Sequence, residues 1–262
     1  MSTLNARCVS GLPEVREGDD VAGLIAQALG SEDLGGKIVA IAHKIVSKAE
    51  GAVVALADIT PTPRAQTLAA EQGKDPRAVQ VVLDQSAEVI RAASGVLICR
   101  THHGFTCANA GVDASNAGDP DTVITLPKDP DASARKIRAR LQELVGASSA
   151  TGPVPNAGAA PAVLVTDSFG RAWRHGQCDV AIGCAGLRPL DDWRGRSDSA
   201  GLELRATWLA VADAIAATAD LARAKDSSEP VVIVSGLERF VTAQDGPGAS
   251  ALLRPVAEDL FR

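Results

Sequence analysis

Short apolar runs recur along this chain, and they constrain its fold more than any other feature. They are rich in Val, Ile and Ala, and several end at a Gly or a polar residue. They lie at 37–42, 95–99, 122–126, 162–166, 180–183 and 230–235. Runs of this length and composition are typical of buried β-strands.

Helical segments are predicted between several of these runs. Asp19 and Asp20 precede a predicted helix at 21–29 that ends at Gly30. Further helices are expected at 75–93, at 129–145 with Asp131 or a near neighbour as the N-cap, and over most of 205–222. The mixture of strands and helices predicts an α/β (α+β) fold.

Composition narrows the classes of protein that this chain can belong to. Its 262 residues are 46% hydrophobic and 22% charged, enough for one large domain or two lobes with a real core. The net charge of −6 disfavours a nucleic-acid binder and an anionic membrane surface, since both need clustered Lys and Arg. A single phosphorylated small ligand stays compatible with this charge.

Targeting and redox signals are weak. No apolar run approaches the ~20 residues that span a bilayer, and the N-terminal residues lack the apolar core of a signal peptide, so we expect a cytoplasmic protein. Five Cys without a Cys-x-x-Cys pair favour reduced thiols over disulfides or a zinc site. Neither a Walker A pattern nor G-x-G-x-x-G is present, which disfavours P-loop and Rossmann folds.

The stretch 100–116 is small, polar and without amphipathic period. Gly111 permits backbone angles that other residues avoid, while Asp113 and Asn116 offer a carboxylate and an amide. These groups suit a metal ion and a polar ligand. An ordinary loop with an Asx-turn at Asp113 is the alternative.

Two other places carry candidate chemistry. Lys44 and Lys48 lie four residues apart just past a predicted strand, where they could bind an anion or simply face solvent. Asp167 and Ser168 follow the run 162–166, and Asp113 and Asp167 could share divalent cations bridged by phosphate oxygens. Asp84 and Glu88, one turn apart on the predicted helix 75–93, could form a ligand pair, although a solvated acidic face is commoner.

Two further segments are assigned from composition. The basic residues of the predicted helix 129–145 are expected on its solvent face; they are Arg135, Lys136, Arg138 and Arg140. Residues 147–160 are rich in Ala, Gly, Ser and Pro, and they predict a flexible loop or a connection between lobes.

Several motifs together resemble the coenzyme F420-0:L-glutamate ligases, the gamma-glutamyl ligases of deazaflavin cofactor synthesis. In order along the chain they are GLPE (11–14), KIVSKAEG (44–51), HGF (103–105), CANAGVDASN (107–116), DPDASA (129–134), TDSFGR (166–171) and GQ with DVAIG (176–183). The resemblance covers roughly the first four fifths of the chain. It implies a two-lobed homodimer with a mixed sheet, in which residues 1–262 form one domain of two intertwined lobes.

The resemblance also implies a GTP-dependent amide ligase with small-molecule substrates, Mg²⁺ or Mn²⁺, and K⁺ as a further cation. Asp113, Asp167 and Ser168 fall at metal-binding positions, and Asp113, Asp167 and Lys48 at catalytic ones. The positions for GTP are Leu12, Pro13, Glu14, His43, Lys44, Lys48, Asn116 and, in the segment 223–226, Lys225. Arg171, Arg174 or Arg196 could hold a substrate carboxylate through two hydrogen bonds.

This chain departs from the family pattern at four positions. His43 replaces a usual Ser, Cys178 a usual Thr, and Trp208 and Ala214 stand where Glu is common. Three hypotheses therefore stay open: a ligase that adds L-glutamate to coenzyme F420-0, a paralogous ligase for another acid or amine, and a nucleotide-binding homologue without turnover.

Overall fold

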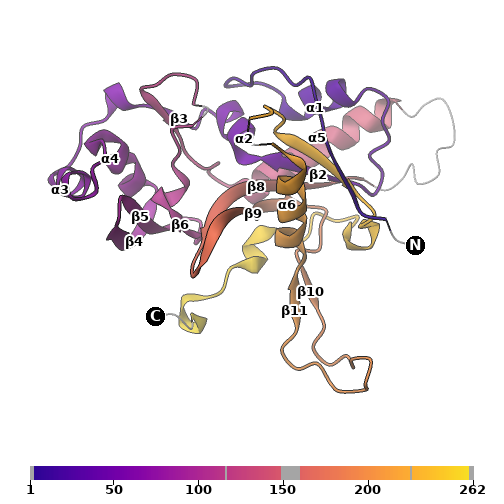
Figure 1. Ribbon diagram of the computed structural model, residues 1–262. Coiled ribbons are helices and arrows are strands. Elements are labelled where there is room, and N and C mark those ends of the chain that lie inside the picture. Colours follow the sequence, from indigo (N-terminus) through magenta and orange to yellow (C-terminus); the bar gives the residue numbers. More distant parts are fainter. Residues whose placement is uncertain (1–2, 116, 149–159, 225, 260–262) are drawn as a thin grey trace.

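The computed structural model describes residues 3–115, 117–148, 160–224 and 226–259, and a five-stranded sheet forms its centre (Figure 1). The strand order is β1 (Asn5–Cys8), β12 (Val231–Ser235), β2 (Ile38–Ala42), β8 (Ala162–Arg171) and β9 (Arg174–Ala185). β2 and β8 are parallel, and the other neighbouring pairs are antiparallel. The predicted α/β (α+β) fold is confirmed.

The apolar runs form central strands because successive side chains alternate between two buried faces. In β2, Val39 and Ile41 belong to one core, whereas Ile38 and Ala40 belong to the other. All four residues are 0% exposed. A strand covered on both sides needs no polar alternation, which explains the continuous apolar pattern of the run 37–42.

Helices cover both faces of the main sheet. On one face lie α1 (Val21–Leu29), α2 (His43–Ala49) and α5 (Pro130–Ser148), whose apolar residues share one core with the sheet. On the other face lies α6 (Val211–Ala222). As predicted, Asp20 caps α1, because its Oδ1 accepts a hydrogen bond from the N–H of Gly23 at 3.0 Å.

A smaller group of elements lies to one side of the main sheet (Figure 1). It contains α3 (Pro63–Gln72), α4 (Pro76–Asp84) and a sheet of β4 (Ser86–Ala93), β5 (Val96–Thr101) and β6 (Thr106–Ala108). These elements share an apolar core of their own. The division of the chain into two intertwined lobes stays a prediction.

The remaining elements are short. β3 (Val53–Ala55) pairs with β7 (Thr122–Ile124). Single-turn 3₁₀ helices occur at Leu56–Asp58, Asn109–Gly111, Glu238–Phe240, Ala249–Leu252 and Val256–Glu258. The five cysteines are free thiols, as predicted. Within the described residues, every helix is too short or too polar to cross a bilayer.

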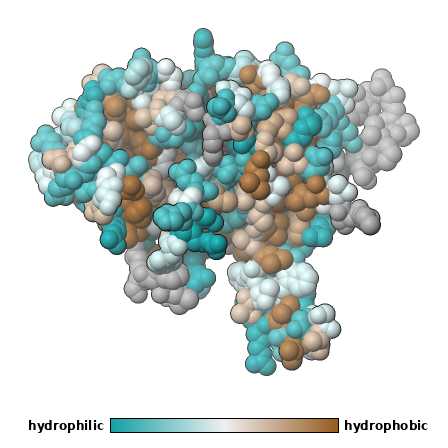
Figure 2. Space-filling view, viewed as in Figure 1, coloured by the Kyte–Doolittle hydropathy of each residue, from teal (hydrophilic) through white to brown (hydrophobic). Residues whose placement is uncertain are grey.

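An arm projects from the main body between β9 and α6 (Figure 1). Its base is the antiparallel pair β10 (Leu190–Asp192) and β11 (Trp208–Ala210). Leu202 and Trp208 are 69% and 48% exposed, and Figure 2 shows apolar residues on the surface of the arm. The prediction of a mostly helical segment at 205–222 is therefore wrong at its start, because β11 pairs with β10 and α6 begins at Val211.

The predicted helix at 75–93 is wrong in its second half. α4 ends at Asp84, and residues 86–93 form β4. Register shifts next to Glu88 and Val89 interrupt the strict alternation of a strand, so the apolar pattern resembles a helical one. Asp84 and Glu88 are consequently not one helical turn apart, and the proposed ligand pair does not form.

Arg138 corrects the prediction that the basic residues of α5 face solvent. Its side chain is 3% exposed, and its Nη1 lies 2.7 Å from Asp245 Oδ1. Its Nε and Nη2 donate to the carbonyls of Pro161 and Thr242. Partners distant in the sequence thus hold a buried arginine that the helical pattern alone assigns to the surface.

The start of α5 agrees with the prediction of an N-cap at Asp131 or a near neighbour. Asp129 makes the cap, since its Oδ1 accepts from the N–H of Ala132 at 2.9 Å. Asp131 instead accepts hydrogen bonds from the N–H groups of Cys184 and Ala249 and so joins α5 to β9 and the C-terminal segment. α5 extends to Ser148, and most of the predicted loop at 147–160 lies outside the described residues.

Candidate active site

A cavity of about 520 Å³ opens where β2 ends. β2 stops at Ala42, whereas its parallel neighbour β8 continues to Arg171 without a β2 partner beyond Thr166. The cavity is lined by the loop 12–15, the start of α2, β8 and the chain around 223–230. Ligands of α/β proteins commonly bind beyond the carboxyl ends of parallel strands, so this is the natural site in the fold.

Most of the residues predicted for the site line this cavity. They are Leu12, Pro13, Glu14, His43, Lys44, Lys48, Asp167 and Ser168. Asp113 is not among the lining residues, but its carboxylate contacts Lys44. Asn116 and Lys225 lie outside the described residues.

α2 starts directly at the end of β2 and places three of these side chains. His43 is 2% exposed, and its Nε2 lies 3.3 Å from Asp167 Oδ1. Its Nδ1 lies 3.2 Å from the Ser47 hydroxyl. Lys44 and Lys48 are one helical turn apart and both line the cavity. Each ammonium group is ion-paired, Lys44 with Asp113 and Lys48 with Glu14, so an anionic ligand would compete with these carboxylates.

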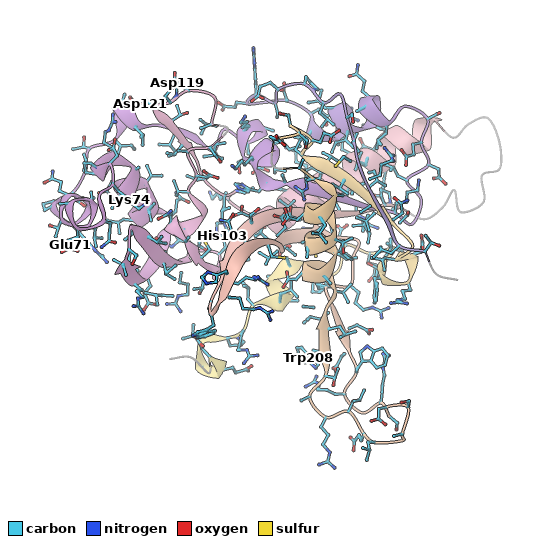
Figure 3. The ribbon with its side chains drawn as sticks, in the orientation of Figure 1. Glu71, Lys74, His103, Asp119, Asp121 and Trp208 are labelled. Atoms are coloured by element: carbon cyan, nitrogen blue, oxygen red, sulfur yellow. The ribbon has the colours of Figure 1, made fainter. Side chains whose placement is uncertain are left out.

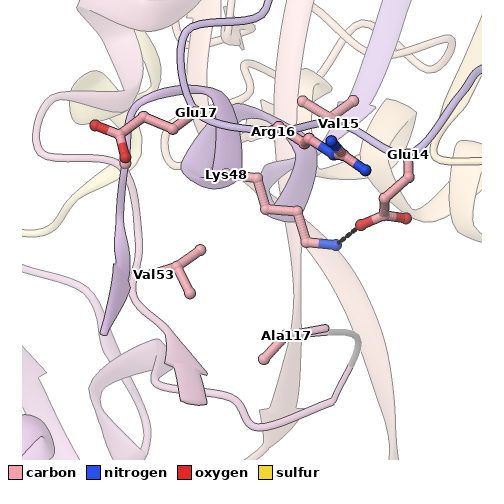
Figure 4. Close-up of a pocket in the computed structure, with 8 residues that line it drawn as sticks. Glu14, Val15, Arg16, Glu17, Lys48, Val53 and Ala117 are labelled. Atoms are coloured by element: carbon pink, nitrogen blue, oxygen red, sulfur yellow. Dashed lines mark hydrogen bonds and ion pairs between the residues drawn. The ribbon is translucent and has the colours of Figure 1, made fainter. Parts of the chain in front are cut away.

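Lys48 also borders a second cavity of about 330 Å³ (Figure 4). This smaller cavity shares Glu14, Val15 and Lys48 with the larger one, and it is further lined by Arg16 and Glu17. Glu14 and Lys48 form an ion pair, drawn as a dashed line in Figure 4. The Glu14–Lys48 ion pair therefore lies where the two cavities adjoin.

Asp113 is held by Lys44 of α2 and by its near neighbour Ser115. Lys44 Nζ lies 2.7 Å from Asp113 Oδ2, and the backbone N–H and hydroxyl of Ser115 donate to the same carboxylate. Burial raises the pKa of Asp113, but the hydrogen bonds from Lys44 and Ser115 outweigh it and leave the pKa below its ordinary value. The contact between Asp113 and Ser115 is the Asx-turn considered from the sequence, now combined with an ion pair.

Asp167 and Ser168 lie within β8 rather than after its end, which corrects the predicted strand boundary. The strand continues because residues 167–171 pair with β9 as an antiparallel hairpin. Asp167 Oδ1 accepts a hydrogen bond from the N–H of Ser168 at 2.8 Å. β6 of the stretch 100–116 contacts β8. Burial, and next the charge of Asp167, raises the pKa of the Cys107 thiol to about 12.

The donor set suits a divalent cation in its chemistry. Carboxylate and hydroxyl oxygens, such as those of Asp113, Asp167 and Ser168, are the ligands that Mg²⁺ and Mn²⁺ prefer. Within the described residues, His, Cys, Asp and Glu form no group of three or more arranged around a metal. A cation here would therefore need oxygens of substrate or water to complete its coordination.

The structure adds to the cavity two acidic residues that sequence reasoning missed, Asp220 and Glu229. Asp179 and Asp226, from segments already indicated by the sequence, also line it, and the lining arginine is Arg223 rather than Arg171, Arg174 or Arg196. The motif DVAIG contained Asp179, and the segment 223–226 contained Arg223, but neither pattern indicated that the two side chains meet.

The chain is similar to known proteins over nearly its whole length. The family model for F420-0:Gamma-glutamyl ligase matches residues 11–236. The chain belongs to this family. It is 43% identical to the coenzyme F420:L-glutamate ligase of Methanopyrus kandleri over 95% of this chain and 94% of that protein. The corresponding values for the Methanothermobacter thermautotrophicus enzyme are 43%, 97% and 97%. As a member of this ligase family, the protein forms carbon–nitrogen amide bonds.

The four departures from the usual pattern of the gamma-glutamyl ligases are unevenly placed. His43 lines the cavity, whereas Cys178, Trp208 and Ala214 are not among the lining residues. Trp208 lies on the projecting arm, as Figure 3 shows, with the guanidinium of Arg194 4.3 Å from its ring centre. Cys178 lies next to the lining residue Asp179 on β9, so of the three residues that do not line the cavity it is the one adjacent to it.

Proposed function

We propose that this ligase adds L-glutamate to coenzyme F420-0, uses GTP and a divalent cation, and proceeds through an acyl phosphate. The observation that carries the proposal is the cavity at the end of β2, in which Lys44, Lys48, Asp167 and Ser168 meet in a member of this family. A homodimer, K⁺ as a further cation and a cytoplasmic location belong to the same proposal.

The reaction needs an activated carboxylate, because a carboxylate and an amine do not condense at neutral pH. The acceptor carboxylate attacks the γ-phosphorus of GTP, the bond to the β–γ bridging oxygen breaks, and GDP leaves. The amine of L-glutamate then attacks the acyl carbon, loses a proton and expels inorganic phosphate. Mg²⁺ or Mn²⁺, when bound, would neutralise charge on the phosphate oxygens.

The residues of the chain have distinct tasks in this scheme. Lys44 and Lys48 bind the phosphate groups and offset the negative charge of the departing GDP. Asp167 and Ser168 would hold the cation from β8, and Asp113 from the loop beside Lys44. His43 fixes the carboxylate of Asp167 from α2, since its Nε2 lies 3.3 Å away.

The positions of the departures support F420-0 over another acceptor. A paralogous ligase for a different acid would be expected to change groups inside the cavity. Of the departures, only His43 lies there, and it already contacts Asp167.

The first test is substitution of the two proposed metal-binding carboxylates. Asp113→Asn and Asp167→Asn should each lower kcat about 100-fold or more, because the charge that holds the cation is lost. The melting temperature should stay within about 3 °C of that of the wild type, since neither carboxylate lies in an apolar core. Asp121→Asn is the control, because Asp121 is an ion-paired carboxylate that contacts Arg77 of α4 and is not among the residues that line the cavity (Figure 3). Full activity of both site variants in folded protein contradicts the metal assignment.

A further inference from the structure

We propose that Asp179 and Arg223 form a positioning pair that orients the Ser168 hydroxyl for the cation-binding role given to it above. The inference rests on the proposed function, in which Ser168 supplies an oxygen to the cation. Asp179 and Arg223 act through Ser168 and Thr166, so they are positioning residues rather than catalytic residues.

Asp179 is the centre of a small buried network. It lies on β9 directly opposite Ser168 of β8 and is 4% exposed. Its Oδ1 accepts a hydrogen bond from Ser168 Oγ at 2.6 Å, and its Oδ2 accepts one from Thr166 Oγ1 at 2.8 Å. The two oxygens of one carboxylate thus hold the hydroxyls on both sides of Asp167.

Arg223 supplies the charge that a buried carboxylate needs. Its Nη2 lies 3.1 Å from Asp179 Oδ2 and donates to Thr166 Oγ1 at 3.0 Å. Its side chain is only 10% exposed, and it follows the last residue of α6. The Asp179–Arg223 pair therefore joins the end of α6 to the β8–β9 hairpin at the wall of the cavity.

One hydrogen-bond donor of the Arg223 guanidinium is unpaired within the part of the chain that the structure describes. Its Nε is buried and has no hydrogen-bond partner among the described residues. An unpaired buried donor costs free energy, so Arg223 is not optimised for stability alone. Its position is instead the one that brings Nη2 to both Asp179 and Thr166 at the cavity wall.

The direction of the hydroxyl proton is what the pair controls. A serine oxygen binds a cation through a lone pair, with its proton directed elsewhere. Because Asp179 accepts the proton of Ser168, the lone pairs of this oxygen point away from Asp179. Thr166 donates a hydrogen bond to Asp179 and accepts one from Arg223, so it links the two members of the pair. The carboxylate of Asp167, between Thr166 and Ser168, contacts His43 of α2 instead.

The experiment is a titration of Mn²⁺ binding, followed by the electron paramagnetic resonance signal of the free ion. Asp179→Asn keeps the shape of the side chain but replaces one acceptor oxygen by a donor nitrogen. We expect the dissociation constant for Mn²⁺ to rise about 10- to 100-fold, as for other groups that orient metal ligands. Asp191→Asn is the control and should keep wild-type affinity. Asp191 is 8% exposed and accepts from Trp193 Nε1, but it lies at the base of the arm.

A second variant separates positioning from folding. Removing one partner of a buried ion pair destabilises a protein, so Asp179→Asn can also lower the melting temperature. The double variant Asp179→Asn/Arg223→Gln removes both charges and should recover thermal stability while Mn²⁺ binding stays weak. If affinity returns together with stability, or if folded Asp179→Asn binds Mn²⁺ like the wild type, the positioning role is overturned. Absence of Mn²⁺ binding by the wild type, with GTP present, would instead overturn the proposed metal chemistry itself.

Discussion

At the residue scale, the contact between Lys44 and Asp113 joins two functions that the sequence assigned separately. Lys44 was predicted to bind nucleotide and Asp113 to bind metal, and the structure places Lys44 Nζ 2.7 Å from Asp113 Oδ2. The lysine thus neutralises the charge of the carboxylate. Under the proposed function, phosphate and cation together replace this internal ion pair.

The same contact predicts how stability depends on pH. The pKa of Asp113 lies below its ordinary value of 3.8, so the ionised carboxylate stabilises the fold above that value. This contribution is lost as the pH falls through the lower pKa of the folded state. It should stay under about 1 kcal/mol, because the Asp113 side chain is 44% exposed.

Urea unfolding of the wild type and Asp113→Asn measures this contribution. The wild type should be the more stable of the two at pH 6, and the difference should shrink as the pH falls toward about 3. A difference that is the same at both pH values would show that the charge of Asp113 does not stabilise the fold.

At the scale of elements, α5 depends on one buried arginine. Arg138→Ala should lower the free energy of unfolding by about 1–3 kcal/mol, because the Pro161 and Thr242 carbonyls lose a charged hydrogen-bond donor, whereas Asp245 is 45% exposed and can be solvated. Lys136→Ala, on an exposed position of the same helix, is the control and should change it by less than about 0.5 kcal/mol. Equal effects of the two variants in urea unfolding would contradict the role of Arg138.

Elements with strong local signals could be predicted from the sequence. α1 has its Asp20 cap and Gly30 end, and β2 and β12 are continuous apolar runs buried on both faces. β4 could not be predicted, because irregularities within it disturb the alternation of apolar and polar side chains and because its formation depends on pairing with β5. Arg138 was misplaced for a related reason, because its partners at 161 and 242–245 are far away in the sequence.

At the scale of the whole molecule, the candidate site is assembled from segments that are distant along the chain. The residues that line the cavity come from 12–15, 42–48, 166–179 and 220–230. Motifs identified His43, Lys44, Lys48, Asp167 and Ser168, because their order along the chain resembles the family. The meeting of Asp179 with Arg223 across the cavity wall could not be predicted, since it depends on how α6 packs against the β8–β9 hairpin.

The measurement that tests the account most directly is mass spectrometry of a reaction with F420-0, L-glutamate, Mn²⁺ and GTP, with ATP in a parallel sample. The account predicts a product heavier by one or more glutamyl residues with GTP, no such product with ATP, and about 100-fold slower product formation with the Asp167→Asn protein. Absence of this product with GTP and folded wild-type protein would contradict the proposed acceptor. Equal product with ATP would contradict the proposed nucleotide.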